Sequence, residues 1–213
     1  MISDRNLHIG LWLSLAAIFV WSGIGCHDIF TWFLEVLPII LGTVILLSVY
    51  SKFRFTRLVC WLMWLHAIVL MVGGHYTYAE VPLFNWIRDI FHLARNDYDR
   101  LGHFMQGFVP AIITREILLR AGIVKRGGWL FFIVVCICLA FSASYELFEC
   151  LTAVSTGAKA DAFLGTQGDP WDTQEDMAMA LIGSITALLT LSKIHDRSLE
   201  KLNENIIAFG NTL

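Results

Sequence analysis

The sequence predicts an all-α membrane protein: a single bundle of six transmembrane helices with a short interfacial helix on its outer side. Three observations support this fold class. Of the 213 residues, 57% are hydrophobic and only 15% are charged, whereas about a quarter of the residues of a soluble domain are charged. The mean hydropathy is +0.65. Six apolar segments each approach the ~20 residues that a helix needs to cross a bilayer.

The apolar segments follow one another along nearly the whole chain, at 7–25, 32–50, 58–74, 101–119, 128–151 and 176–192. Each is expected to be helical, because lipid offers backbone groups no hydrogen-bond partners and the period-2 alternation of barrel strands is missing. The fourth segment is the most polar, since it contains His103, Gln106, Arg115 and Glu116, and the sixth is short. Residues 1–195 are therefore expected to form one six-span domain, followed by a cytoplasmic tail at 196–213.

The distribution of Lys and Arg predicts the orientation of this bundle. The N-terminus, the loops at 51–57 and 120–127 and the C-terminal tail receive Arg5, Lys52, Arg54, Arg57, Arg115, Arg120, Lys125, Arg126, Lys193, Arg197 and Lys201. The opposite side receives Arg88, Arg95, Arg100 and Lys159. Because short cytoplasmic loops are rich in Lys and Arg, both termini are expected in the cytoplasm. The first segment is interpreted as a retained helix, and cleavage before Cys26 is the alternative.

Two longer segments are expected on the outer side. From Pro82 to Asp97, apolar residues recur at helical spacing, which predicts a short helix in the outer interface with Trp86 as its anchor. A surface helix that caps the bundle is the alternative. Residues 152–175 are rich in Gly, Ala, Thr and Asp and are expected to form a loop. Gly73 and Gly74 are expected to end the third helix.

Polar residues gather at the outer ends of four different segments. The topology was derived from Lys and Arg alone, yet it places all four groups at one face. Asp99 and His103 are four residues apart, so both are expected on one face of the fourth helix. The same holds for Glu146 with Glu149 and for Asp172 with Asp176. The candidate site residues are His75, Tyr78, Asp99, Arg100, His103, Glu146, Glu149, Asp172, Gln174 and Asp176.

Two kinds of chemistry fit this set of side chains. A divalent metal cation would take one nitrogen and several oxygen ligands, from His103, Glu146, Glu149, Asp172 and Asp176. Acid–base chemistry would use the catalytic groups His103, Glu146, Glu149 and Asp176, with a substrate bound by Asp99, Arg100, His75, Tyr78, Asp172 and Gln174. The alternative is a buried network of ion pairs and hydrogen bonds that only fixes helix packing. Glu35 is interpreted as an interfacial residue.

The expected function is that of a membrane-embedded enzyme or binding protein acting on a lipid or envelope precursor at the outer leaflet. The net charge of −3 argues against nucleic acid as a partner. No serine lies in a G-x-S-x-G motif, so a serine hydrolase is not expected. One alternative is a small transporter or proton-coupled carrier, for which Pro38 and Pro110 are expected to interrupt two helices. The other is an accessory membrane scaffold.

Four blocks, at 75–82, 98–104, 142–149 and 168–174, resemble the signature blocks of the YjdF family of bacterial inner-membrane proteins, which has no assigned function. The resemblance covers nearly the whole chain and implies a multi-pass location in the bacterial inner membrane. A more distant similarity is to VanZ-like membrane proteins, a family linked to glycopeptide-antibiotic tolerance. It rests on Asp99, Arg100, His103, Phe104, Glu146, Glu149, Asp176 and Gly183. Arg100, Glu149 and Ala180 stand where that pattern has Lys, Gln and Asn, so only architecture and site location are carried over.

Overall fold

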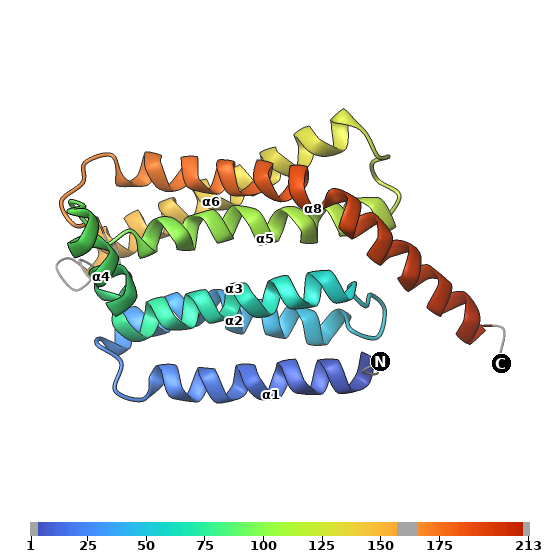
Figure 1. The fold of residues 1–213 in the computed structure, drawn as a ribbon, viewed down its shortest axis with the longest axis horizontal. Helices are drawn as coiled ribbons and strands as arrows, with labels where there is room; N and C mark the ends of the chain where they lie inside the picture. The colour runs from blue at the N-terminus through green and yellow to red at the C-terminus, as the bar shows by residue number, and fades with distance from the viewer. Residues whose placement is uncertain (1–3, 157–165, 211–213) are drawn as a thin grey trace.

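A computed structural model shows the chain as a bundle of α-helices (Figure 1). The structure describes residues 4–156 and 166–210, so the middle of the predicted loop at 152–175 and the end of the predicted tail lie outside the described residues. The helices in order are α1 (Asp4–Gly23), α2 (Ile29–Val49), α3 (Arg57–Tyr76), the short 3₁₀ helix η1 (Tyr78–Glu80), α4 (Pro82–Phe91), α5 (Tyr98–Arg120), α6 (Gly128–Thr156) and α8 (Asp172–Gly210). The predicted all-α class is confirmed.

The six long helices form two groups of three. In Figure 1, α1, α2 and α3 make up one group and α5, α6 and α8 the other, and contacts between α3 and α5 join the groups. The short helix α4 lies at one end of the bundle, here called the α4 end. Both chain termini lie at the opposite end, here called the terminal end. The turns before α2 and η1 also belong to the α4 end.

Five of these helices are long and apolar enough to cross a membrane, namely α1, α2, α3, α6 and α8. Helix α5 differs in composition, although its 23 residues would extend about 34 Å. It packs against α3, α6 and α8, and 13 of its residues are buried. Polar residues in such a helix face protein rather than lipid, which is where a bilayer tolerates them.

Several helix boundaries differ from the sequence-based expectation. Helix α3 does not end at Gly73-Gly74 but continues to Tyr76. Gly73 instead makes room for an aromatic ring, because a Cβ atom there would lie 2.2 Å from Cε2 of Tyr78. Helices α2 and α5 run through Pro38 and Pro110 without ending, so the interruption expected of a carrier is not found at either proline. Helix α8 begins before residue 176 and continues well past residue 192.

Helices α5 and α8 pack more extensively than any other pair, and small residues allow their close approach. Gly183 on α8 faces the backbone of α5, since a Cβ atom on it would lie 2.1 Å from the carbonyl oxygen of Phe104. Ala180 is fully buried at the same contact. This contact places the first turns of α8 directly beside the first turns of α5.

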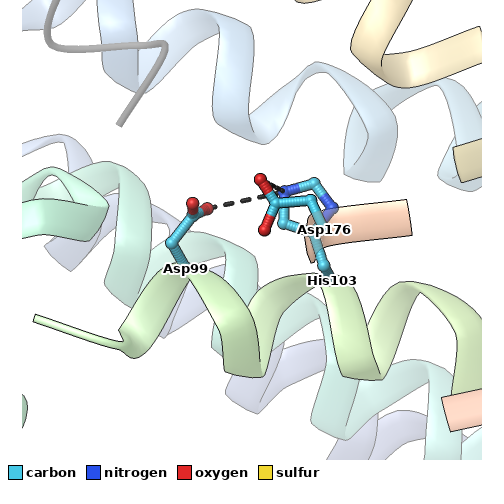
Figure 2. Close-up of side chains that lie close together, drawn as sticks. All are labelled: Asp99, His103 and Asp176. Carbon is cyan, nitrogen blue, oxygen red and sulfur yellow. Dashed lines mark ion pairs between the residues drawn. The ribbon is translucent and has the colours of Figure 1, made fainter. Parts of the chain in front are cut away.

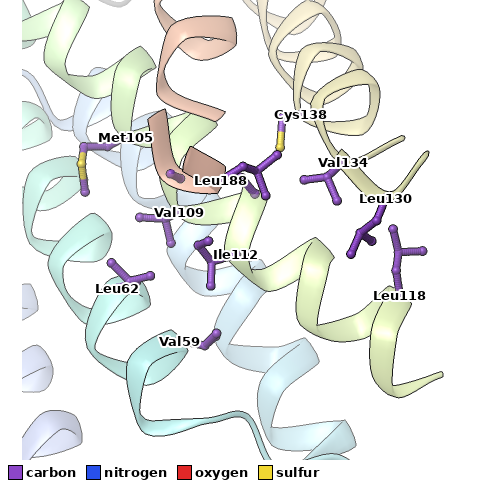
Figure 3. Close-up of a cluster of buried hydrophobic side chains, with 12 residues drawn as sticks. Val59, Leu62, Met105, Val109, Ile112, Leu118, Leu130, Val134, Cys138 and Leu188 are labelled. Atoms are coloured by element: carbon purple, nitrogen blue, oxygen red, sulfur yellow. The ribbon is translucent and has the colours of Figure 1, made fainter. Parts of the chain in front are cut away.

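A buried apolar cluster fills the interior between the two groups of helices (Figure 3). Its members come from α3, α5, α6 and α8 and include Val59, Met105, Val109, Ile112, Val134, Cys138 and Leu188. Such a cluster holds the four helices in fixed rotation about their axes, because closely packed side chains do not slide freely. The cluster occupies the middle of α5 and separates the polar side chains near its start from those near its end.

A polar network closes the terminal end of α5. The buried carboxylate of Glu116 accepts hydrogen bonds from the Thr56 backbone nitrogen (2.9 Å), the Thr56 hydroxyl (2.7 Å) and Nε2 of His195 (3.0 Å). Arg115 donates to Nδ1 of His195 (2.8 Å), so the imidazole donates through Nε2. Because these groups satisfy one another, the network ties α5, α8 and the turn before α3 together. The sequence did not predict that these residues meet.

Candidate functional site

The candidate site lies at the α4 end, where α5 and α8 begin. Asp99 is in the first turn of α5, and Asp172 and Glu175 are in the first turn of α8. Carboxylates are favoured there, because the free N–H groups of a helix N-terminus carry partial positive charge. The close α5–α8 contact brings the two acidic N-termini together, so basic side chains are needed between them.

Arg100 of α5 is the first of these basic side chains, with only 10% of the side chain exposed. Its Nη1 atom bonds to Oδ1 of Asp176 and, at 3.1 Å, to Oδ1 of Asp172. Its Nη2 atom bonds to Glu175 (2.7 Å) and Asp169 (3.2 Å). Arg100 was a candidate for substrate binding, and the structure places its guanidinium among four carboxylates of this chain.

Arg95 is the second basic side chain, and it was not among the predicted site residues. It is 11% exposed and bonds to Oδ1 of Asp172 and to Oδ2 of Asp99 (3.3 Å). Its Nη1 atom also lies 3.5 Å from Asp169. The spacing of four residues between Arg95 and Asp99 could have indicated this ion pair from the sequence. The fold adds Asp172, which the sequence spacing does not place near Arg95.

His103 lies at the centre of the site, with its side chain 6% exposed (Figure 2). Its Nε2 atom is 3.5 Å from Oδ1 of Asp99 on the same helix and 3.7 Å from Oδ2 of Asp176 on α8. Its Nδ1 atom is 2.9 Å from Oε1 of Gln106. Side-chain oxygen atoms therefore lie near both ring nitrogens, and the imidazole links α5 to α8.

Helix α6 adds the two glutamates that the sequence singled out. Oε1 of Glu146 lies 3.5 Å from Nδ1 of His103, and the Glu146 side chain is 5% exposed. This oxygen has no hydrogen-bond partner within the described part of the chain. The same holds for the buried hydroxyl of Ser142, one turn earlier on α6. Glu149 is buried as well, one turn after Glu146.

Glu35 on α2 extends the site toward the first group of helices. Its interpretation as an interfacial residue is wrong, since Glu35 is only 5% exposed. Its carboxylate accepts hydrogen bonds from the hydroxyls of Tyr78 and Tyr145. Burial raises the pKa of the Tyr78 hydroxyl well above its usual value, so this group remains protonated and donates. Tyr78 thus holds Glu35 in place, and periodicity alone did not reveal that α2 turns Glu35 inward.

Two predicted site residues lie elsewhere. His75 belongs to the contact between α1 and α3, where its Nδ1 atom is 3.0 Å from the carbonyl oxygen of Ser22. Its ring stacks on Trp21 with the centroids 4.5 Å apart. Gln174 is exposed at the start of α8. Neither makes a described contact with His103, whereas Asp99, Arg100, Asp172, Asp176 and Glu146 meet at one place.

Acidic groups outnumber basic groups at this site. The carboxylates are Asp99, Glu146, Glu149, Asp169, Asp172, Glu175 and Asp176, and the basic partners among the described residues are Arg95, Arg100 and His103. The arginines bond to exposed carboxylates such as Glu175 and also to the buried Asp99 and Asp176, which in turn face His103. Glu146 faces His103 without an arginine partner in the described part of the chain. Buried carboxylates in excess attract cations or protons, because an unpaired negative charge away from water is costly.

The fold and the site define a multi-pass α-helical membrane protein with a buried histidine and acidic cluster. Comparison with known proteins identifies the group. Residues 7–197 match the family described as "Predicted membrane protein (DUF2238)", and the chain belongs to this family. It is 47% identical over 189 residues to "Inner membrane protein YjdF" of Escherichia coli (strain K12), covering 89% of this chain and 90% of that protein. The predicted resemblance and the inner-membrane, multi-pass location are thereby confirmed. No solved structure matches the chain.

Proposed function

We propose that this protein is a membrane-embedded enzyme or binding protein that holds a lipid or an envelope precursor at the outer leaflet. One observation supports this most directly. Helices α5, α6 and α8 enclose His103 among carboxylates, and one of these, Glu146, has an oxygen atom without a hydrogen-bond partner in the described structure. A buried polar atom left unpaired costs free energy unless something pairs with it. A bound ligand would supply that partner.

In this proposal α5 also crosses the membrane, which makes six spans in all, both termini are cytoplasmic and the α4 end faces the periplasm. The length of α5 and its enclosure by other helices support a spanning position. The Lys and Arg residues of the loops at the terminal end support the orientation. Helix α4 supports an interfacial position for its end of the bundle, because its apolar side chains are exposed: Leu83 (60%), Trp86 (62%), Ile90 (50%) and Phe91 (68%). A short helix with such a face is suited to lie in the membrane interface. It would place the site at headgroup level.

The site residues would divide into two sets. Glu146 and Glu149 are not paired with arginine in the described structure, so they are available to accept a hydrogen bond or a proton from a ligand. Arg95 and Arg100 hold Asp99, Asp172 and Asp176 in place, and Gln174 lies exposed in the first turn of α8. The excess of acid restricts the ligand: its polar group would be neutral or cationic, unless a cation enters with it.

The test is the lipid content of the purified protein. The wild type and Glu146→Gln are extracted in native membrane discs, and their lipids are compared with those of the whole membrane by mass spectrometry. We expect one lipid or lipid-linked precursor to be enriched with the wild type and lost in the variant. Glu80→Gln is the matched control, because Glu80 is 58% exposed at the same end. Equal lipid content in all three proteins would contradict the proposal. So would a Glu146→Gln protein that is destabilised but keeps the lipid content of the wild type.

A further inference from the structure

We infer that Asp99, His103 and Asp176 bind a divalent transition-metal cation, Zn²⁺ or Mn²⁺. The inference rests on the proposed function in that it names a ligand of the same site. One donor atom from each of these residues lies within 4.8 Å of the other two, and all three residues are buried. Two of them come from α5 and one from α8, so the site exists only where these helices meet (Figure 2).

The distances fit metal ligands better than they fit hydrogen bonds. Nε2 of His103 is 3.5 Å from Oδ1 of Asp99 and 3.7 Å from Oδ2 of Asp176. An N–H···O hydrogen bond is usually about 2.7–3.2 Å long. Two ligands that each lie about 2.0–2.2 Å from one tetrahedral cation are roughly 3.3–3.6 Å apart. The Asp99 distance already lies in this range, and a small closure of the site around a cation would bring the Asp176 distance into it as well.

The hydrogen bond at the other ring nitrogen prepares His103 to be a ligand. Oε1 of Gln106 is an acceptor 2.9 Å from Nδ1, so Nδ1 carries the hydrogen. In the neutral imidazole, the lone pair is then on Nε2, and it faces two carboxylate oxygens. Three electron-rich atoms repel one another unless a positive charge lies between them. Either a proton on Nε2 or a metal cation supplies that charge, and the histidine ligands of a metal usually donate the other ring N–H in this way.

Each carboxylate ligand is also oriented by an arginine through its second oxygen atom. Asp99 offers Oδ1 to the site, while its Oδ2 accepts from Arg95 at 3.3 Å. Asp176 offers Oδ2 to the site, while its Oδ1 accepts from Arg100. Partners of this kind fix ligand direction in metal sites. The two arginines therefore position the ligands and leave one oxygen of each carboxylate facing Nε2.

The surroundings indicate the charge and the kind of cation. Glu146 adds negative charge on the other side of the imidazole: it is a further buried carboxylate, and its Oε1 atom, which lacks a hydrogen-bond partner in the described structure, lies 3.5 Å from Nδ1 of His103. One imidazole nitrogen with carboxylate oxygens is a mixed donor set that suits Zn²⁺ or Mn²⁺, whereas Ca²⁺ prefers oxygen alone. A divalent cation here would also lower the negative charge of the site and so favour an anionic headgroup beside it.

The experiment measures metal binding by the full-length protein in detergent. The protein is stripped with a chelator and titrated with ZnCl₂, MnCl₂ and CaCl₂, and bound metal is counted by mass spectrometry. We expect saturable binding of Zn²⁺ or Mn²⁺ at about one ion per chain and much weaker binding of Ca²⁺. His103→Gln and Asp176→Asn should abolish it. Gln106→Leu, which removes only the orienting acceptor, should weaken it about 10- to 100-fold.

The control is Glu175→Gln, because Glu175 bonds to Arg100 like Asp176 but does not face His103. It should bind metal like the wild type. If the wild type binds neither Zn²⁺ nor Mn²⁺ saturably, or if His103→Gln and Asp176→Asn bind like the wild type, the inference is wrong. If one of these two variants fails to fold, the other and Gln106→Leu decide. Lipid content measured on the metal-free protein separates the two proposals. If the protein retains its lipid but does not bind metal, only the metal site is wrong. If it binds metal but no lipid is enriched with it, only the lipid proposal is wrong.

Discussion

A Cβ atom on Gly107 of α5 would lie 1.8 Å from the carbonyl oxygen of Ala180 on α8, so these two residues bring the helix backbones into direct contact. Only glycine fits at such a position. The contact lies one turn below His103 and determines how far Asp176 is from it. The geometry of the candidate site therefore depends on a residue that carries no chemistry.

Replacing this glycine should separate the two helices. Gly107→Leu is expected to lower the free energy of unfolding by more than about 2 kcal/mol, since overpacking of a close contact forces backbone shifts. A lower thermal unfolding midpoint in detergent would show it. Gly10→Leu on α1 is the matched control, because a Cβ atom at Gly10 meets nothing within 4 Å. Equal midpoints for the two variants would contradict the prediction.

Removing Arg100 should leave buried carboxylates without a counter-charge. Arg100→Gln is expected to cost about 3–5 kcal/mol, because Asp176 and Asp172 are only 2% and 7% exposed. Arg100→Lys should restore only part of this, since an ammonium group does not bridge several carboxylates as a guanidinium does. The measurement is thermal unfolding. Arg88→Gln should cost less than about 1 kcal/mol, because Arg88 pairs with the exposed Asp89; a similar loss in both variants would disprove the argument.

The network at the terminal end predicts a coupling between Glu116 and His195. Glu116→Leu leaves buried donors of Thr56 and His195 unpaired and should cost about 3 kcal/mol. His195→Leu should also destabilise the protein, but the double variant should lose less than the two single losses together. Unfolding midpoints of the four proteins give this coupling. Additive losses would mean that the two side chains do not act as a unit.

Asp28 should stabilise α2 in a pH-dependent manner. It is the N-cap of α2, and its Oδ1 atom accepts from the Thr31 backbone nitrogen at 2.7 Å. This bond lowers the pKa of the Asp28 carboxyl. A pKa that is lower in the folded state means that the stabilisation is present above the unfolded value of about 3.9 and is lost as the pH falls through the folded value.

Asp28→Ala is therefore expected to destabilise the protein by about 1 kcal/mol at pH 7 and by less below about pH 4. Thermal unfolding at both pH values checks this. Asp28→Asn should remain close to the wild type at pH 7, because Asn is an equally good N-cap that does not titrate. A difference between wild type and Asp28→Ala that stays constant with pH would count against the assigned role.

The six-span proposal predicts that the two ends of α5 lie on opposite sides of the membrane. In a variant without its native cysteines, His92→Cys before α5 should react with an impermeant maleimide added to intact spheroplasts. Lys125→Cys after α5 should react only after the membrane is opened. Both residues are exposed in the structure. Labelling of both from the same side would show that α5 does not cross.

Much of the fold followed from local composition. The apolar segments predicted α1, α2, α3, α6 and α8 to within a few residues at most ends, because the need for internal backbone hydrogen bonds in lipid makes any long apolar segment helical. The helix at Pro82 was predicted by periodicity over 82–97, but it ends at Phe91, where the cap residue His92 adopts a left-handed conformation (φ 54°). The predicted end of α3 and the predicted length of α8 were wrong, because helix ends depend on tertiary contacts such as that of the Tyr78 ring with Gly73.

By itself, the sequence determined the fold class, the family blocks and the gathering of polar residues at one end of the bundle. Only the tertiary structure decided which of them meet: Asp176 with His103 and Arg100, Glu35 with Tyr78, and His75 with none of these. The physical reason is that spacing along one helix specifies a shared face, but not the direction in which that face points. That direction is set by packing, here by the close approach of Gly107 to Ala180 and of Gly183 to Phe104 between α5 and α8.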